Sequence, residues 1–163
     1  MQDHLVRATA AIGEDDRLRA ILEDLCRLTD MGFAAVARVT DQRWIACQVV
    51  DRIEFGLQPG EELQIKTTIC DDIRQSGRAI VIDSVSADER WRTHPTPIIY
   101  GFESYASFPI DLPDGSFFGT LCAIDPAPRT LSTDTIARTM TQYAARAAQI
   151  LQERIDARAA QPG

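Results

Sequence analysis

The sequence lacks long hydrophobic runs, and this limits where the chain can reside. Its uninterrupted apolar stretches are only a few residues long, whereas a membrane-spanning helix needs about 20 apolar residues. The N-terminal segment "MQDHLVRATAAIGEDD" has no apolar core of signal-peptide length before charged residues return. We therefore expect a cytoplasmic protein that does not interact with membranes.

Paired cysteines, clustered histidines and catalytic motifs are also missing. The four cysteines form no C-x-x-C pair, which argues against a zinc knuckle or a disulfide framework and predicts buried free thiols. The two histidines, His4 and His94, are too few for a metal site with several histidine ligands. Because no G-x-S-x-G, G-x-x-x-x-G-K or HExxH motif occurs, we expect no catalytic residues, no metal and no enzyme activity.

A surplus of positive charge is absent as well. The formal net charge is −7, and binding to nucleic acids or anionic membranes requires a basic face. We therefore expect neither as a partner. The 163 residues, of which 45% are hydrophobic, are enough for one domain with a substantial core.

The pattern of apolar residues predicts helices at both ends and strands between them. Leucine and isoleucine recur every three or four residues over 14–31, which predicts a helix that Asp15 or Asp16 caps and Gly32 ends. We predict a loop over 51–67 and a long final helix capped by Ser132 or Thr133. The other predicted elements are strands 33–40, 43–50, 79–85, 104–112 and 116–126, a helix 68–76 and a helical turn around 96–100. This order indicates an α+β fold with an antiparallel sheet.

Several stretches resemble a GAF domain, the small sensory module of signalling proteins. The most specific is the run G-x-L-C-x-x-D-x-x-P-R at Gly119–Arg129, which resembles GAF domains attached to bacterial histidine kinases. The stretches "AIVIDSVSADERW" and "YGFESYASFPID" also match, and the resemblance spans roughly residues 14–155. It implies a central antiparallel sheet of about five to six strands, with the terminal helices on one face and a ligand-type pocket under a long loop on the other. We place the domain at 14–158, after a tail or helix extension (1–13) and before a C-terminal tail (159–163).

The resemblance implies a non-catalytic sensory or regulatory domain of a signal-transduction system. Such a domain binds a small molecule or a partner and signals through its terminal helices to an output domain such as a histidine kinase. One alternative is a dimerisation module with a vestigial pocket. The ligand and any cofactor stay unidentified at this stage.

Cys70 raises the question of thiol chemistry. We favour a small buried residue that faces the sheet, because Asp71 and Asp72 would raise its pKa and so disfavour a nucleophile. Free methionine sulfoxide reductases, a GAF subfamily, need a second cysteine in the loop before the fourth strand, and that loop, residues 90–104, contains none. Photoreceptor GAF domains that bind a bilin covalently usually carry a Cys-His pair near this helix, and this pair is missing here. Both remain alternatives, and we expect no covalent bilin.

The strand over 104–112 suggests where a pocket would lie. Side chains alternate between the two faces of a strand, so Ala106, Phe108 and Ile110 are expected to face the terminal helices, and Tyr105 and Ser107 the pocket. With the aromatic-rich loop 86–103, they predict the ligand-lining residues Tyr105, Ser107, Tyr100, Trp91, His94, Cys70 and Cys122. An aromatic wall favours a planar guest, and Arg90 or Arg92 could meet a carboxylate or phosphate on it.

His94 and Asp83 also have simpler interpretations. A lone loop histidine is commonly a solvated or capping residue, and heme ligation by His94 is a minor alternative. We expect Asp83 on a solvated loop face.

The final helix suggests a dimer. Its residues Ile136, Met140, Tyr143, Ala147 and Ile150 repeat at steps of four and three, as in a coiled coil. If this line packs on the sheet, the second line, Ala144, Leu151 and Arg158, is left exposed. We therefore expect a parallel homodimer through a four-helix bundle of the terminal helices.

Overall fold

The structure, a computed structural model, describes residues 3–64 and 69–160. Its centre is a six-stranded antiparallel sheet with the strand order β3-β2-β1-β6-β5-β4. The helices are α1 (His4–Gly13), α2 (Asp16–Thr29), α3 (Cys70–Ser76), α4 (Pro95–Tyr100) and α5 (Asp134–Ala159). The strands are β1 (Phe33–Val39), β2 (Trp44–Asp51), β3 (Glu62–Leu63), β4 (Ile80–Ile82), β5 (Ser104–Asp111) and β6 (Phe117–Asp125). The α+β class and the antiparallel sheet are confirmed.

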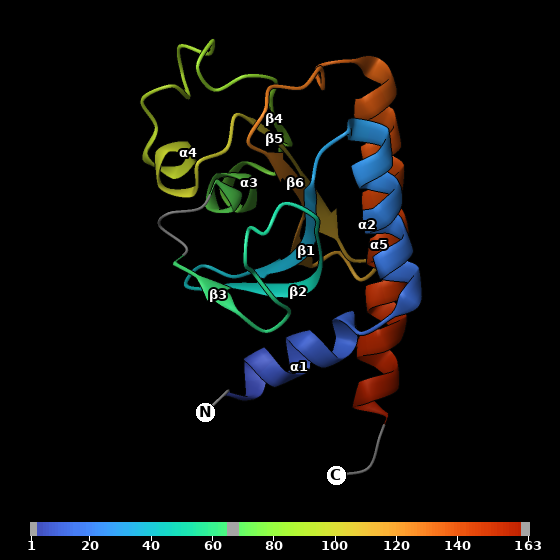
Figure 1. Cartoon of the computed structure of the whole chain (residues 1–163). Coiled ribbons are helices and arrows are strands. Elements are labelled where there is room, and N and C mark those ends of the chain that lie inside the picture. The colour runs from blue at the N-terminus through green and yellow to red at the C-terminus, as the bar shows by residue number, and fades with distance from the viewer. Residues whose placement is uncertain (1–2, 65–68, 161–163) are drawn as a thin grey trace.

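The helices divide between the two faces of the sheet. Figure 1 shows α2 and α5 side by side on one face, and α3 and α4 on the other. Side chains alternate along β5 as predicted: Ala106, Phe108 and Ile110 join the core under α2 and α5, whereas Tyr105 joins the core on the opposite face. The sheet therefore separates two cores. None of the helices in the described ranges is long and apolar enough to span a membrane.

Helix α2 begins as predicted but ends differently. The Asp15 carboxylate accepts a hydrogen bond of 2.8 Å from the Arg17 amide and caps the first turn. At the other end Asp30, not Gly32, takes the left-handed conformation, with φ 57°. Aspartate tolerates this region better than most residues, because its short side chain can form local hydrogen bonds. Gly32 serves another purpose, since a Cβ there would lie 2.2 Å from Cγ2 of Ile53.

Helix α5 is capped by Thr133, whose hydroxyl accepts a 3.2 Å hydrogen bond from the Ile136 amide. The expectation that its second apolar line is exposed is wrong for Ala144 and Leu151, which are both buried. The sheet covers one side of α5, and α2 and α1 cover others, so both lines are used within the chain. Arg158 is exposed as expected.

Residues 4–13, expected as a tail or a helix extension, form the separate helix α1. It lies across the lower end of the sheet and α5 in Figure 1. The side chain of Arg154, on α5, donates a 2.9 Å hydrogen bond to the Ala11 carbonyl, and the Gln48 amide donates one of 2.9 Å to the Gly13 carbonyl. These bonds add to the backbone hydrogen bonds that the same carbonyl groups accept from the Glu14 and Asp15 amides just beyond α1.

Two short elements were misjudged from the sequence. β3 lies within the predicted loop 51–67, where its polar sequence gives no strand signal, yet Glu62 and Leu63 pair with β2. β4 spans three residues rather than the predicted 79–85. Residues 65–68, which include the predicted start of the helix 68–76, lie outside the described residues.

Gly119 sits where β6 meets β1, and no other residue fits there. A Cβ at this position would lie 1.8 Å from the Ala37 carbonyl oxygen. Because that atom belongs to the backbone of a central strand, relief requires the two strands to separate. The glycine thus permits the central pairing of the sheet.

We expect Gly119→Ala to lower the free energy of unfolding by about 3 kcal/mol, because it overpacks a central strand pair. Gly77→Ala is the control: Gly77 has a φ of 71°, and a Cβ there would meet nothing within 4 Å. That change places an alanine in the left-handed conformation, which lowers the free energy of unfolding by only about 1 kcal/mol. Urea denaturation of both variants measures the difference. Equal losses would contradict the close approach at Gly119.

Candidate functional site

An open groove lies on the face of the sheet opposite α2 and α5. Its volume is about 500 Å³, and it runs between the connection after β2, the end of α4 and the end of β6. Its lining residues are 53–57, Leu63, 99–102 and 124–126. We call this space the outer groove.

A smaller space lies beneath the outer groove, and we call it the inner cavity. Its volume is about 50 Å³, which is enough room for roughly three or four water molecules. Six residues line both spaces: Phe55, Leu57, Leu63, Tyr100, Phe102 and Ile124. The inner cavity is completed by Phe33, Trp44, Ile69, Cys70, Thr96, Tyr105 and Cys122. The two spaces therefore share a boundary of apolar and aromatic side chains.

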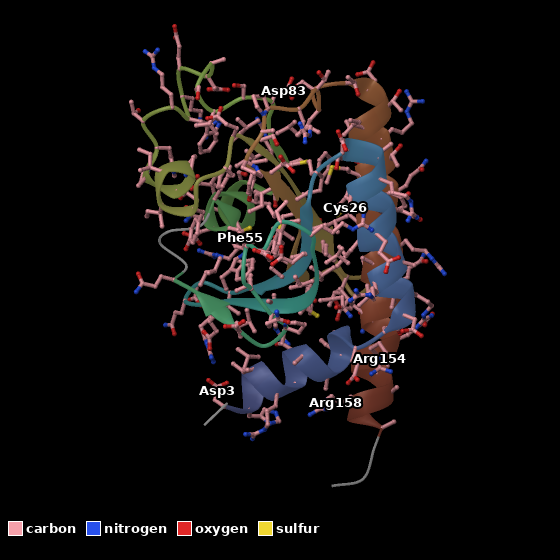
Figure 2. All side chains as sticks on the ribbon, in the orientation of Figure 1. Asp3, Cys26, Phe55, Asp83, Arg154 and Arg158 are labelled. Carbon is pink, nitrogen blue, oxygen red and sulfur yellow. The ribbon has the colours of Figure 1, made fainter. Side chains whose placement is uncertain are left out.

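The aromatic side chains of this boundary come from the connection after β2 and from the end of α4. The rings of Phe55 and Tyr100 lie 6.0 Å apart, and Phe55 also contacts Phe33 at 4.8 Å. Figure 2 shows Phe55 on the face of the sheet away from α2 and α5. Asp51 fixes its loop, because the Asp51 carboxylate accepts hydrogen bonds of 3.0 Å from the Phe55 amide and 2.8 Å from the Gly56 amide. The sequence analysis overlooked Asp51, an aspartate just before a loop that can bond to later amides.

Cys70 forms part of the floor of the inner cavity. It is buried and faces the sheet, as predicted. Its sulfur lies 3.2 Å from the Thr120 hydroxyl, 3.5 Å from the Tyr105 hydroxyl and 3.9 Å from the Ser107 hydroxyl. The thiol of Cys122 completes this ring of polar groups.

These neighbours set the acidity of the thiols. Hydrogen bonding with Cys122, reinforced by Thr120 and Tyr105, lowers the pKa of Cys70 to about 6 against the opposing effect of burial, and the nearby Trp44 N–H adds to this lowering. The same bond with Cys70, together with burial, raises the pKa of Cys122 well above its usual value. Cys70 is thus the more acidic thiol of the pair.

The expectation that Asp71 and Asp72 raise the pKa of Cys70 is wrong. The Asp71 carboxylate accepts 3.0 Å hydrogen bonds from the Arg74 guanidinium and from the Gln75 amide on the outer side of α3. Adjacent residues on a helix point in different directions. Sequence proximity therefore overstated the influence of these carboxylates on the thiol.

Two polar side chains of the inner cavity have no hydrogen-bond partner among the described residues. They are the indole Nε1 of Trp44, on β2, and the hydroxyl of Thr96, on α4. Both residues are 3% exposed, and both line the inner cavity. The Trp44 N–H lies close enough to Cys70 to help lower its pKa, without hydrogen-bond geometry.

Four of the seven predicted ligand-lining residues line these spaces: Tyr100, Tyr105, Cys70 and Cys122. Ser107 is buried beneath Cys70 and is not among the described lining residues. Trp91 and His94 are also absent from that lining, and their rings contact each other at a tilt, with centroids 4.9 Å apart. The His94 Nδ1 accepts a 3.2 Å hydrogen bond from the Thr96 amide, so His94 caps α4, one of the interpretations considered for it.

Asp125 joins the outer groove to the terminal helices, and the sequence analysis assigned it no role. Asp125 is a lining residue of the groove, and its carboxylate accepts a 2.9 Å hydrogen bond from the Gly32 amide. It also pairs with the Arg129 guanidinium at 3.4 Å. Arg129 in turn donates a 2.7 Å hydrogen bond to the carbonyl of Asp30, the residue that ends α2. One chain of contacts therefore runs from the groove to the end of α2.

Asp83 organises the approach to α5, and the expectation of a solvated loop face is wrong. Its carboxylate accepts hydrogen bonds from the amides of Leu131 and Ser132, both at 2.9 Å, and from the Ser132 hydroxyl at 3.0 Å. Figure 2 shows Asp83 beside the start of α5. A carboxylate that accepts several backbone hydrogen bonds fixes the segment that donates them.

No cluster of potential metal ligands occurs within the described ranges.

The acidity of Cys70 is directly measurable. As the pH rises through about 6, the folded protein is expected to gain the ultraviolet absorbance of one thiolate. Cys70→Ser should abolish this step, and Cys122→Ala should move it to higher pH, because the hydrogen bond with Cys122 contributes most to the lowered pKa. Burial raises the pKa of the remaining cysteines Cys26 and Cys47, so they do not contribute.

The same shift predicts how stability depends on pH. The folded-state pKa of Cys70 lies below the usual thiol value of about 8.5. Its ionisation therefore stabilises the fold increasingly as the pH rises from about 6 to about 8.5, and this contribution is lost as the pH falls through about 6. A thiolate step that begins only above about pH 8 would contradict the arrangement.

Comparison with known proteins places the fold in a family. The family model described as "GAF domain" matches residues 14–151. A search among curated proteins found no match. The GAF domain of a phosphoenolpyruvate-protein phosphotransferase from Acinetobacter is similar, with 11% identity, a TM-score of 0.69, and coverage of 93% of this chain and 92% of that chain.

Two further solved structures have the same fold. A domain of a two-component sensor histidine kinase protein, described as putative, from Sinorhizobium meliloti has 13% identity and a TM-score of 0.64 over 91% of this chain and 98% of that chain. The type II free methionine-R-sulfoxide reductase from Thermoplasma acidophilum has 10% identity and a TM-score of 0.63 over 85% of this chain and 92% of that chain. At these identities the likeness shows the fold alone. The family match, which covers most of the chain, shows that the protein belongs to the GAF domain family.

Proposed function

We propose that this GAF domain is a non-catalytic sensory domain. It binds a small molecule in the outer groove and inner cavity and transmits the bound state to α2 and α5. The observation that carries this proposal is the position of Asp125, which lines the groove and hydrogen-bonds to Gly32 just beyond α2. A ligand in the groove meets the residue that holds the end of a terminal helix.

The sheet offers a second route between ligand and helices. Along β6, Cys122 and Ile124 line the inner cavity, whereas Leu121 and Ala123 pack in the core under α2 and α5. A shift of this strand caused by a ligand moves both sets of side chains together. Because the interior is closely packed, small displacements pass between the two cores.

The proposal places the domain within a larger signalling system in the cytoplasm. The sensor histidine kinase domain from Sinorhizobium meliloti, which shares the fold, makes a histidine kinase a suitable output domain. The terminal helices would connect the two. No catalytic step is assigned to the site, and an assay with free methionine sulfoxide and a thiol reductant is expected to show no turnover.

Native mass spectrometry of protein purified from its own host tests the proposal. We expect a small molecule bound to each subunit and lost on mild denaturation. Tyr100→Ala should abolish this added mass, because the Tyr100 ring lines both the outer groove and the inner cavity. Ile98→Ala, on the same helix but 68% exposed, is the control and should retain it. Subunits without any bound molecule would contradict the proposal and favour a vestigial pocket.

We further propose a parallel homodimer through the outer faces of α2 and α5. Leu151→Glu is unsuitable as a test, because Leu151 is fully buried within the subunit. Leu28, on α2, is a large apolar side chain that is 39% exposed on this face. Leu28→Glu is expected to convert the dimer to a monomer in sedimentation experiments, because the interface would then bury an unpaired charge. Ile98→Glu, on the opposite face of the sheet, should leave the dimer intact. If the unmodified protein is a monomer at high micromolar concentration, the dimer proposal is wrong.

A further inference from the structure

The inner cavity contains two buried polar groups that require a partner. The Trp44 N–H and the Thr96 hydroxyl belong to different elements, β2 and α4, and line the same small space. Neither has a hydrogen-bond partner among the described residues. Buried polar groups in folded proteins are nearly always paired, and those that are not call for a ligand, an ion or a water.

The chemistry of these two groups defines what can satisfy them. An indole N–H can only donate a hydrogen bond, so its partner supplies an acceptor. The Thr96 hydroxyl can donate to the same acceptor. The cavity volume of about 50 Å³ admits only a few atoms. The part of a ligand that enters is therefore a small acceptor group, such as a carbonyl oxygen.

The outer groove defines the rest of the ligand. The boundary between groove and cavity is apolar and includes the rings of Phe55 and Tyr100. Ile99, on the groove wall, is 56% exposed, an apolar surface that a ligand would cover. Aromatic walls of this kind favour a flat, apolar body through ring contacts and burial of surface.

The charges around the site disfavour an acidic ligand. The ionisable groups among the described lining residues of the two spaces are the carboxylates of Glu54 and Asp125, the thiols of Cys70 and Cys122 and the phenols of Tyr100 and Tyr105; no described arginine, lysine or histidine lines either space. The expectation that Arg90 or Arg92 meets a carboxylate or phosphate gains no support: neither is a described lining residue, and Arg90 lies over the Trp91 ring at 4.6 Å. Among the described lining residues, no cation is present to replace the hydration that an anion would lose.

We propose, on the basis of the proposed function, that the site binds an uncharged, planar aromatic molecule with one hydrogen-bond acceptor. The acceptor enters the inner cavity and receives hydrogen bonds from Trp44 Nε1 and Thr96 Oγ1. The aromatic body lies in the outer groove against Phe55 and Tyr100. The ligand class thus follows from the two donors without a described partner and from the lack of a described cation in the lining.

Nuclear magnetic resonance of the indole N–H groups tests this proposal with defined probes. Acetophenone carries the proposed features, benzoate replaces its neutral carbonyl acceptor with a charged carboxylate, and ethylbenzene lacks an acceptor. Acetophenone is expected to shift the Trp44 resonance downfield and to leave the Trp91 resonance unchanged, because Trp91 does not line the described site. Benzoate and ethylbenzene should each bind at least about tenfold more weakly, the loss expected when a buried donor stays unpaired or an anion is desolvated.

Two variants test the contribution of each donor to binding. Thr96→Val and Trp44→Phe each remove one donor while keeping most of the side-chain volume, and each should weaken acetophenone binding about fivefold to tenfold. Ile98→Ala, an exposed site on α4, is the matched control and should bind normally. Equal binding of benzoate or ethylbenzene would overturn the ligand class, as would an unmoved Trp44 resonance at millimolar acetophenone, which indicates a cavity filled by water.

Different results test the ligand class and the proposed sensory function. If protein from its own host carries a charged or non-planar molecule, the ligand class is wrong and the sensory function stands. If host protein carries a molecule whose removal leaves the Trp44 resonance unchanged, the ligand class is again overturned. Host protein with no bound molecule contradicts the proposed function itself, whatever the probes show.

Discussion

The alternation of side chains along β6 supports both cores of the molecule. Leu121 and Ala123 pack under α2 and α5, while Cys122 and Ile124 face the inner cavity. This arrangement depends on a close approach to β1, which only glycine permits at position 119. Since strand pairing fixes which residues face which side, ligand site and terminal helices share one strand. A domain built in this way cannot easily change one face without affecting the other.

The site combines a rigid floor with walls that come from loops. The floor is a set of hydroxyl and thiol groups around Cys70, held by β5, β6 and α3. The walls come from the Phe55 loop, which Asp51 fixes through backbone hydrogen bonds, and from the end of α4. Loops on a rigid scaffold can vary in sequence without disturbing the sheet. We therefore assign the proposed ligand specificity to the walls and to the Trp44 and Thr96 donors. The proposed coupling to α2 depends on Asp125 and Arg129.

Local sequence patterns predicted the sheet, the two terminal helices and the inward direction of Tyr105, because apolar periodicity and strand alternation depend on near neighbours. They could not predict contacts that depend on the assembled fold. In the sequence, Trp44 is one strand residue among others, and only the fold shows that its N–H lies in a cavity without a partner among the described residues. Asp125 stands in the sequence only as one position of a motif. His94 and Trp91 were predicted to line the pocket because the loop 86–103 is rich in aromatic residues. The turn into α4 instead makes His94 a cap and leaves Thr96 in the cavity. The polar β3 gave no strand signal at all.

The central claim is that occupation of the groove reaches the terminal helices through Asp125. The most direct measurement is the hydrogen exchange of the Gly32 amide, which donates to the Asp125 carboxylate, in host-purified protein before and after removal of its bound molecule. The account predicts that this amide and those in the last turn of α2 exchange more slowly in the occupied protein. Protection confined to residues that line the groove, with unchanged exchange at Gly32 and in α2, would contradict it.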